Sequence, residues 1–239
     1  MCDVCGCGDH ELVPVEVQTR LLDHNDQVAA HLREHFDRQG VTAINLMGSP
    51  GAGKTALLEA TARRLSGTLS AVSGDLATEN DANRLRRAGI PSWAITTGTA
   101  CHLDADMVHD ALHGEVGDAV KASDWFVIEN VGNLVCPAIY DLGQHANVVA
   151  VSVTEGEDKP TKYPVMFAHA DLVLLTKVDL VPHLPGYEVQ RFHDAVAEVM
   201  PRARVIEVSA VTGEGLEAWV EALEGWRDQR TARVSLTGK

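Results

Sequence analysis

The 239-residue chain suits a single α/β domain with at most a short appendage. Its 34 Asp and Glu residues outnumber its 20 Lys and Arg residues, and the net charge of −14 argues against a protein that binds nucleic-acid phosphates broadly. No apolar run approaches the ~18 residues of a membrane span, and the acidic start lacks the pattern of a secretory signal peptide, so we expect a cytoplasmic protein.

The order of patterns along the chain predicts four regions. Residues 1–16 form an N-terminal tail, and residues 17–40 form a helix closed by Gly40. The apolar stripe of that helix is made by Val17, Leu21, Val28, Leu32 and Phe36. A main domain follows over 41–229, and the chain is expected to fray over 230–239.

Strand and helix patterns alternate throughout the main domain. Strands are predicted at 41–47, 68–73, 92–97, 124–130, 147–153, 171–177 and 204–210. Helices are predicted at 54–65, 79–88, 104–113, 162–169, 188–199 and 214–227. Because hairpin signals are absent, this alternation favours an α/β fold with a mostly parallel twisted sheet and helices on both faces. Ligands of such sheets bind beyond the carboxyl ends of the strands.

The first strand runs into GSPGAGKT, which matches the phosphate-binding P-loop pattern G-x-x-x-x-G-K-[ST]. Its glycines let backbone N–H groups surround a phosphate, Lys54 adds a positive charge, and the Thr55 hydroxyl can bind Mg²⁺. A strand before the motif and a helix after it supply the expected context. The predicted nucleotide-binding residues here are Gly48, Ser49, Gly51, Ala52, Gly53, Lys54, Thr55 and Ala56.

Two later motifs indicate that the base is guanine. Thr176-Lys177-Val178-Asp179 resembles the N/T-K-x-D motif of GTPases, in which the carboxylate accepts hydrogen bonds from the guanine edge. Thr replaces the commoner Asn and offers fewer ways to brace the loop. SAVTGEG, which contains Ser209 and Ala210, resembles the fifth GTPase motif, whose backbone contacts the guanine oxygen.

Two carboxylates are candidates for the hydrolysis step beside Lys54. Asp75 follows the second predicted strand and Glu129 ends the fourth, so either can hold Mg²⁺ or orient the attacking water. Asp75 could instead cap the following helix. No arginine in this stretch is an evident arginine finger, so we expect slow intrinsic turnover.

The cysteines favour metal binding over disulfides, because their number is odd and no export signal is present. Cys2, Cys5 and Cys7 gather three soft ligands, which suit Ni²⁺ or Zn²⁺, in the tail.

Cys101, His102 and Cys136 follow predicted strands and suggest a second metal site. The alternative for the tail cysteines is thiols that bind no metal. The alternative for the second site is that Cys101 and Cys136 are small buried residues and that His102 caps a helix. Most other histidines are expected to be solvated on helices, and the His31/His35 pair at helical spacing is only a faint metal signal.

Together these motifs resemble the HypB family, the nickel-incorporation GTPases of [NiFe]-hydrogenase maturation. The resemblance also includes SGDLATENDANRL, TGTACHLDA, IENVGNLVCP and VTEGEDKPTKYP and covers nearly the whole chain. It implies a SIMIBI-class P-loop GTPase that uses GTP and Mg²⁺ and dimerises with nucleotide. It further implies a nickel site at Cys2, Cys5 and Cys7, and a GTP-linked Ni²⁺/Zn²⁺ site at Cys101, His102 and Cys136.

The resemblance implies two protein partners, a small nickel/zinc accessory protein and the hydrogenase large-subunit precursor. Two alternatives stay open at this point. One is a maturation GTPase for another nickel or cobalamin enzyme, although the Cys-Pro-His motif of urease accessory GTPases is not matched. The other is a metal sensor or buffer in which the nucleotide is only structural.

Overall fold

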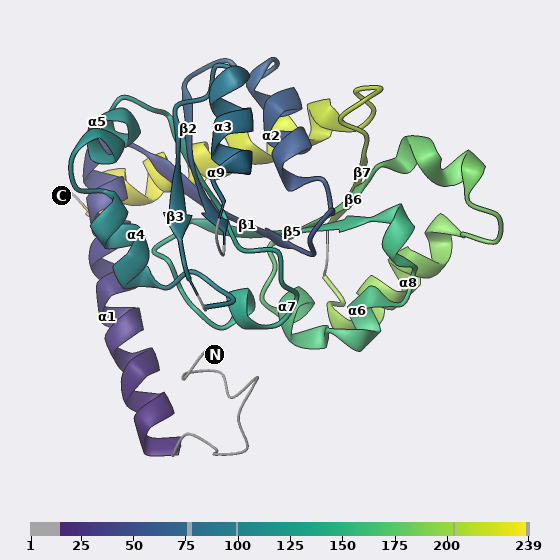
Figure 1. Ribbon diagram of the computed structural model, residues 1–239, viewed down its shortest axis with the longest axis horizontal. Helices are drawn as coiled ribbons and strands as arrows, with labels where there is room; N and C mark the ends of the chain where they lie inside the picture. Colours follow the sequence, from purple (N-terminus) through teal and green to yellow (C-terminus); the bar gives the residue numbers. More distant parts are fainter. Residues whose placement is uncertain (1–14, 76–77, 99, 203, 238–239) are drawn as a thin grey trace.

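A seven-stranded parallel sheet organises the chain (Figure 1). The computed structural model describes residues 15–75, 78–98, 100–202 and 204–237, so Cys2, Cys5 and Cys7 lie outside the described residues. The strand order is β3-β2-β4-β1-β5-β6-β7. The strands are β1 (Thr42–Gly48), β2 (Leu69–Asp75), β3 (Ser92–Thr96), β4 (Trp125–Glu129), β5 (Ala146–Ser152), β6 (Leu172–Thr176) and β7 (Val205–Val208).

All seven strands were predicted within a few residues, as was the mostly parallel α/β arrangement. The apolar runs form strands because helices bury both faces of the central sheet, so both sets of alternating side chains must be apolar. Every residue of β1, β4 and β6 is buried.

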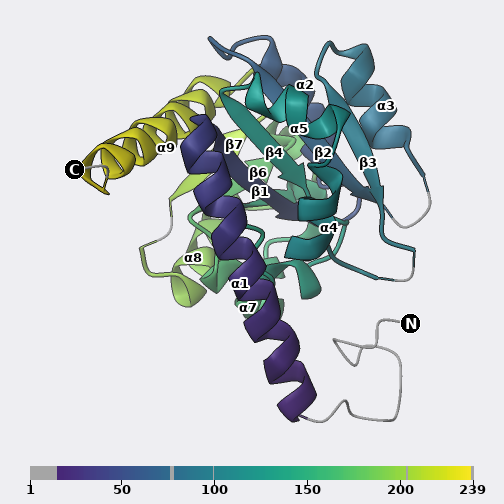
Figure 2. The same ribbon diagram turned by 90° about the vertical axis from the view of Figure 1, so that its left-hand side faces the viewer.

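The helices divide between the two faces of the sheet. They are α1 (Val15–Gln39), α2 (Lys54–Ala62), α3 (Asn80–Arg87), α4 (Ala105–Ala111), α5 (Glu115–Lys121), α6 (Lys159–Lys162), α7 (Pro164–Ala168), α8 (Val189–Val199) and α9 (Leu216–Thr237). One core cluster joins α2, α3 and α9 to one face. On the other face, α1, α4 and α5 cover β2, β4 and β1, whereas α7 and α8 cover β5 and β6 (Figure 2).

The C-terminal prediction was wrong, because α9 continues to Thr237 instead of fraying from residue 230. The buried Arg230 side chain donates from Nε to Thr42 Oγ1 at 3.1 Å and so anchors the distal part of the helix to the sheet. Trp219 anchors the proximal part by donating from Nε1 to Thr61 Oγ1 at 2.9 Å. These long-range contacts override a local sequence that is polar.

Two other predictions needed local correction. The predicted helix at 162–169 is two short helices, α6 and α7, that meet at Tyr163 immediately before Pro164, where an α-helix is sterically disfavoured. The short helix α5 was not predicted, although Val116 and Val120, four residues apart, pack into the core.

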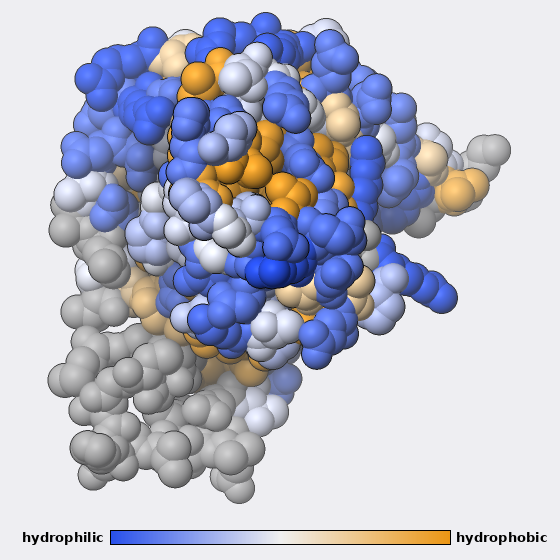
Figure 3. All heavy atoms as spheres, turned by 90° about the vertical axis from the view of Figure 1, so that its right-hand side faces the viewer, coloured by the Kyte–Doolittle hydropathy of each residue, from blue (hydrophilic) through white to orange (hydrophobic). Residues whose placement is uncertain are grey.

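The face drawn in Figure 3 is largely polar. On the face that presents β7 and α8, apolar atoms gather in a central patch within a hydrophilic surround (Figure 3). Among the described residues, no helix combines the length and the apolar character needed to cross a membrane.

Candidate functional site

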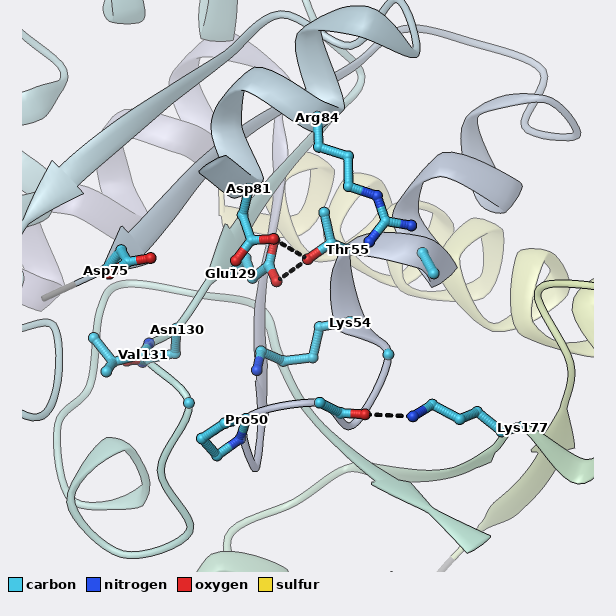
Figure 4. Close-up of a pocket in the computed structure, with 15 residues that line it drawn as sticks. Pro50, Lys54, Thr55, Asp75, Asp81, Arg84, Glu129, Asn130, Val131 and Lys177 are labelled. Carbon is cyan, nitrogen blue, oxygen red and sulfur yellow. Dashed lines mark hydrogen bonds between the residues drawn. The ribbon is translucent and has the colours of Figure 1, made fainter. Parts of the chain in front are cut away.

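A cavity of about 540 Å³ lies beyond the carboxyl ends of β1, β2 and β4, between α2 and α3 (Figure 4). Eight predicted site residues line it, and the others in the phosphate loop, Gly48, Ser49 and Ala52, flank it without lining it. The lining residues are Pro50, Gly51, Gly53, Lys54, Thr55, Ala56, Gly74, Asp75, Asp81, Arg84, Glu129, Asn130, Val131, Gly132 and Lys177.

Two glycines of the phosphate loop occupy positions where a side chain would not fit or would strain the backbone. Gly53 precedes α2 with φ of 90°, a left-handed conformation that side chains disfavour. A Cβ on Gly48 would lie 2.2 Å from the Ala150 carbonyl oxygen, so only glycine fits beside β5. The buried Lys54 amine donates to the carbonyls of Gly48 and Ser49 at 3.2 and 3.3 Å. Lys54 is therefore held across the loop in which a phosphate would sit.

The Thr55 hydroxyl lies between two carboxylates at the first turn of α2. Its Oγ1 is 2.8 Å from Glu129 Oε1 and 2.9 Å from Asp81 Oδ1. A hydroxyl has one proton, so it can donate to only one of these acceptors. Glu129 Oε2 is also buried and has no hydrogen-bond partner among the residues that the structure describes. Three converging oxygen ligands with too few protons fit a hard divalent cation such as Mg²⁺.

Burial is the largest influence on the pKa values of Glu129 and Lys54. It raises the pKa of Glu129 to about 7, although Lys54 and the Thr55 hydrogen bond act in the opposite direction. Burial likewise lowers the pKa of the Lys54 amine, partly offset by Glu129 and Asp81. The carboxyl group therefore holds a proton more readily than an exposed one, and a bound cation would displace it.

Asp75 lines the same cavity but lies apart from Thr55, and Asp81 occupies the place beside Glu129 (Figure 4). The Asp75 carboxylate accepts hydrogen bonds from the Thr78 hydroxyl and backbone N–H at 2.7 and 3.3 Å. It does not cap α3, whose N-cap residue is Glu79. The alternative of a helix cap was therefore wrong, since Asp75 bonds to Thr78 and the N-cap residue of α3 is Glu79.

Arg84 also lines the cavity, although the sequence indicated no candidate arginine there. Glu59 holds its guanidinium through two hydrogen bonds of 2.7 and 2.8 Å. Both Asp81 and Arg84 lie on α3. Their signal in the sequence is their position in the helix that follows β2, because the start of that helix must face the carboxyl edge of the sheet.

The predicted guanine motif packs against the phosphate loop. Lys177 adopts φ of 59° and donates from Nζ to the Gly51 carbonyl at 2.6 Å. The Thr176 hydroxyl donates to the Ala52 carbonyl at 2.6 Å, so threonine braces the loop directly despite being shorter than asparagine.

Asp179 and Ser209 meet at the far end of this motif. The Ser209 hydroxyl donates to Asp179 Oδ1 at 2.5 Å and accepts from the backbone N–H groups of Val211 and Thr212. Ala210 follows Ser209 in the same turn. The structure thus brings the two predicted guanine-binding segments together, although of these segments only Lys177 lines the phosphate cavity.

Cys101, His102 and Cys136 also come together, with ligand atoms all within 4.8 Å of one another. The two sulfurs are 3.0 Å apart, longer than the ~2.05 Å of a disulfide. His102 and Cys136 are buried, and the His102 ring stacks on Tyr140 with centroids 4.0 Å apart. Burial lowers the pKa of His102, which favours the neutral imidazole that binds metals. Two thiols and one imidazole suit Zn²⁺ or Ni²⁺.

The segment of residues 130–136, here the connecting loop, touches the phosphate loop directly. Gly48 and Asn133 form an isolated antiparallel bridge. A Cβ on Gly132 would lie 2.9 Å from the backbone nitrogen of Pro50, so the two loops are packed as closely as glycine permits. Movement of one loop must therefore displace the other.

Asn133 joins this contact to the cysteine cluster. Its Nδ2 donates to the Cys101 carbonyl at 3.2 Å, and its Oδ1 accepts from the Val135 N–H at 3.0 Å. Val135 directly precedes Cys136. One side chain thus spans the two cysteine-bearing segments, and nothing in the spacing of the sequence signalled it.

Comparisons with known proteins agree with this geometry. Residues 42–207 match the family described as CobW/HypB/UreG, nucleotide-binding domain. The chain is 48% identical over 227 residues to the hydrogenase maturation factor HypB of Rhizobium leguminosarum bv. viciae, covering 94% of this chain and 73% of that protein.

Two crystal structures of HypB proteins are similar over most of the chain. HypB from Helicobacter pylori in complex with nickel has a TM-score of 0.81 at 39% identity, with 87% of this chain and 97% of that chain covered. HypB from Archaeoglobus fulgidus has a TM-score of 0.78 at 40% identity, with 86% and 100% covered. The chain therefore belongs to the HypB branch of the CobW/HypB/UreG family of P-loop nucleotide-binding proteins.

Proposed function

We propose that this chain is a GTP-hydrolysing nickel metallochaperone that delivers Ni²⁺ to the large-subunit precursor of a [NiFe]-hydrogenase. The observation that carries the proposal is the direct link between a P-loop cavity and a Cys₂His cluster through Asn133. A nucleotide site joined to a soft-ligand site is what a protein needs if hydrolysis controls the binding and release of a metal cargo. HypB relatives named as hydrogenase maturation factors support the choice of client.

The phosphate cavity would bind GTP through the backbone N–H groups of its loop and Lys54. Lys54 would exchange its contacts with the Gly48 and Ser49 carbonyls for the β- and γ-phosphates. Thr55, Glu129 and Asp81 would hold Mg²⁺, which supplies charge neutralisation at the transferred phosphate. Asp75 lines the remaining wall, where it can orient the attacking water.

Slow intrinsic turnover is consistent with the position of Arg84. This is the one arginine among the described lining residues, and its guanidinium is already bound to Glu59. Arg84 forms two hydrogen bonds to Glu59, so it would have to break them before it could stabilise charge on the transferred phosphate. Guanine specificity would come from Asp179, held in position by Ser209, with backbone contacts from Ala210.

The γ-phosphate would act on the metal cluster through the connecting loop. Gly132 is packed against Pro50, so the contents of the phosphate loop must influence the position of Asn133 and Cys136. Three ligands leave a four-coordinate metal incomplete, and a second copy in a nucleotide-dependent homodimer could complete it. Hydrolysis would then loosen the site for delivery of Ni²⁺, with Zn²⁺ as a competing ion.

Cys2, Cys5 and Cys7 would form a separate, nucleotide-independent nickel site in the tail. A small nickel/zinc accessory protein would be the second partner in the transfer. Deletion of residues 1–8 should remove the tightest nickel site and leave GTPase activity intact, as metal titration and phosphate release would measure. Unchanged tight nickel binding in that truncation would refute the assignment.

A transfer assay tests the function itself. Purified precursor, Ni²⁺ and the full chain are mixed with GTP, GDP or no nucleotide, and nickel is counted in the re-isolated precursor. GTP should increase nickel transfer with the wild type, whereas an Asp179→Asn variant should require xanthosine triphosphate instead. Nickel transfer that is the same with every nucleotide would contradict the proposal.

A further inference from the structure

Four histidines outside the cysteine cluster line one groove between α1 and α4. His31 and His35 lie four residues apart on α1, and His109 and His113 lie four residues apart on and just after α4. The groove has a volume of about 260 Å³. The two helices run side by side in both views of the ribbon, and they pack within one core cluster.

The two helices are fixed to each other beside this groove. The buried Asn25 of α1 accepts from the Ala105 N–H at 2.9 Å, and His24 lies 3.1 Å from the Asp106 carboxylate. These contacts hold the start of α4 against α1. The position of the two histidine pairs is therefore set by packing and does not depend on an ion to bring the helices together.

Each histidine pair has the spacing of a two-point metal ligand, because residues i and i+4 lie on the same face of a helix. Ligand atoms of His109, Asp110 and His113 all lie within 4.8 Å of one another. The His109 and His113 rings are 4.9 Å apart between centroids. The Gln39 amide donates to His35 Nε2 at 2.8 Å, so the lone pair of this imidazole nitrogen is held by Gln39 and a metal ion bound there would have to displace that hydrogen bond.

Some charged groups near the groove favour a bound cation and others oppose it. Asp110 lies 3.5 Å from His109 Nδ1 and can orient that ring or bind a cation itself. Arg38 also lines the groove and opposes a cation. The net charge of −14 favours cations near the surface as a whole. Leu32 and Leu112 form the apolar part of the lining.

We propose that this groove binds one divalent transition-metal ion, Ni²⁺ or Zn²⁺, through imidazoles from both α1 and α4. Imidazole suits both ions, and thiols are not needed. The site is separate from Cys101, His102 and Cys136, but the same helix connects them: the Cys101-His102 pair precedes α4, and His109 and His113 lie at its other end. The groove thus offers a nitrogen-ligand site for metal next to a sulfur-ligand site.

Equilibrium dialysis of the full chain against Ni²⁺, with bound nickel counted per chain, tests this site. Two variants each remove one pair, His31→Gln with His35→Gln, and His109→Gln with His113→Gln. The matched control, His169→Gln with His183→Gln, removes two exposed histidines elsewhere. Each pair variant should lose one nickel ion per chain or bind it at least ~10-fold more weakly, and the control should match the wild type.

When a histidine-pair variant is combined with Cys101→Ser and Cys136→Ser, the losses of bound nickel should add, because the two sets of ligands are independent. Circular dichroism without metal checks that each variant folds. If either pair variant binds nickel with the number of ions and affinity of the wild type, the two-helix site is wrong. Equal losses in the control and the pair variants would also overturn it, since they would indicate scattered binding to surface histidines.

Discussion

The phosphate cavity and the cysteine cluster are built in different ways. In the cavity, Glu129 ends β4, Lys54 and Thr55 begin α2 after the loop that follows β1, and hydrogen bonds of 2.8 to 3.3 Å hold them. In the cluster, Cys101 and Cys136 lie beyond the ends of β3 and β4, and they are joined by the contact between their sulfurs and by the Asn133 side chain. We call the cavity the fixed site and the cluster the adjustable site, because in the proposed function the state of the nucleotide would change the geometry of the metal ligands.

Replacement of Lys54 should have the largest effect on the fixed site. Lys54→Ala removes a buried positive charge that faces the phosphates, so GTP affinity should fall by ~100-fold or more. Titration of a fluorescent GTP analogue measures the loss. Lys121→Ala, an exposed lysine on α5, is the matched control and should bind normally. A loss below ~3-fold would show that Lys54 is not a phosphate ligand.

Asp179→Asn should have the next largest effect, because it changes which base the fixed site accepts. Loss of the carboxylate leaves the guanine donors unpaired, so GTP should bind ~100-fold more weakly and xanthosine triphosphate more tightly. Competition between the two nucleotides measures the exchange. Asp228→Asn, whose side chain is 76% exposed, serves as the control. If the wild type binds ATP and GTP equally, the assignment of guanine is wrong.

Glu129→Gln should change how the free energy of unfolding depends on pH when metal and nucleotide are absent. Burial raises the pKa of Glu129 to about 7, so the folded state favours the protonated carboxyl group. The stability this provides is complete below the unfolded pKa of about 4.5 and is lost as pH rises through about 7. The glutamine variant lacks this loss, which amounts to about 3 kcal/mol over the full range.

Urea unfolding in EDTA at about pH 6 and about pH 8.5 samples part of that range, safely above the sequence pI of 5.1. Between these values the wild type should lose about 1 kcal/mol of unfolding free energy relative to Glu129→Gln. The same difference at both pH values would show that Glu129 does not titrate there.

The sequence predicted the fixed site better than it predicted the contacts around it. GSPGAGKT is a local pattern whose residue types follow from the phosphate it binds, so its spacing identifies it, whereas TKVD remains a prediction of a guanine site that depends on its place after β6. Asp81 belongs to the same oxygen cluster but comes from α3, and its contact with Thr55 is made only by folding. The C-terminal helix was missed for a similar reason, since Arg230 reaches Thr42 across the fold.

The adjustable site was predicted only as a set of candidate ligands. Cys101, His102 and Cys136 were identified by residue type, but their approach to within 4.8 Å depends on how two loops cross the edge of the sheet. Asn133 could not be found from one sequence, because an asparagine in a loop has many possible partners. The histidine groove was equally hidden, since α1 and α4 are far apart in the chain.

The affinity of the Cys₂His cluster for nickel in two nucleotide states tests the central claim most directly. The full chain with Cys2, Cys5 and Cys7 replaced by Ser is titrated with Ni²⁺ in the presence of GDP or a non-hydrolysable GTP analogue. We expect nickel to bind at least ~10-fold more tightly with the analogue, and we expect a much smaller difference when Asn133→Ala is added. Equal nickel affinity in both nucleotide states would contradict it.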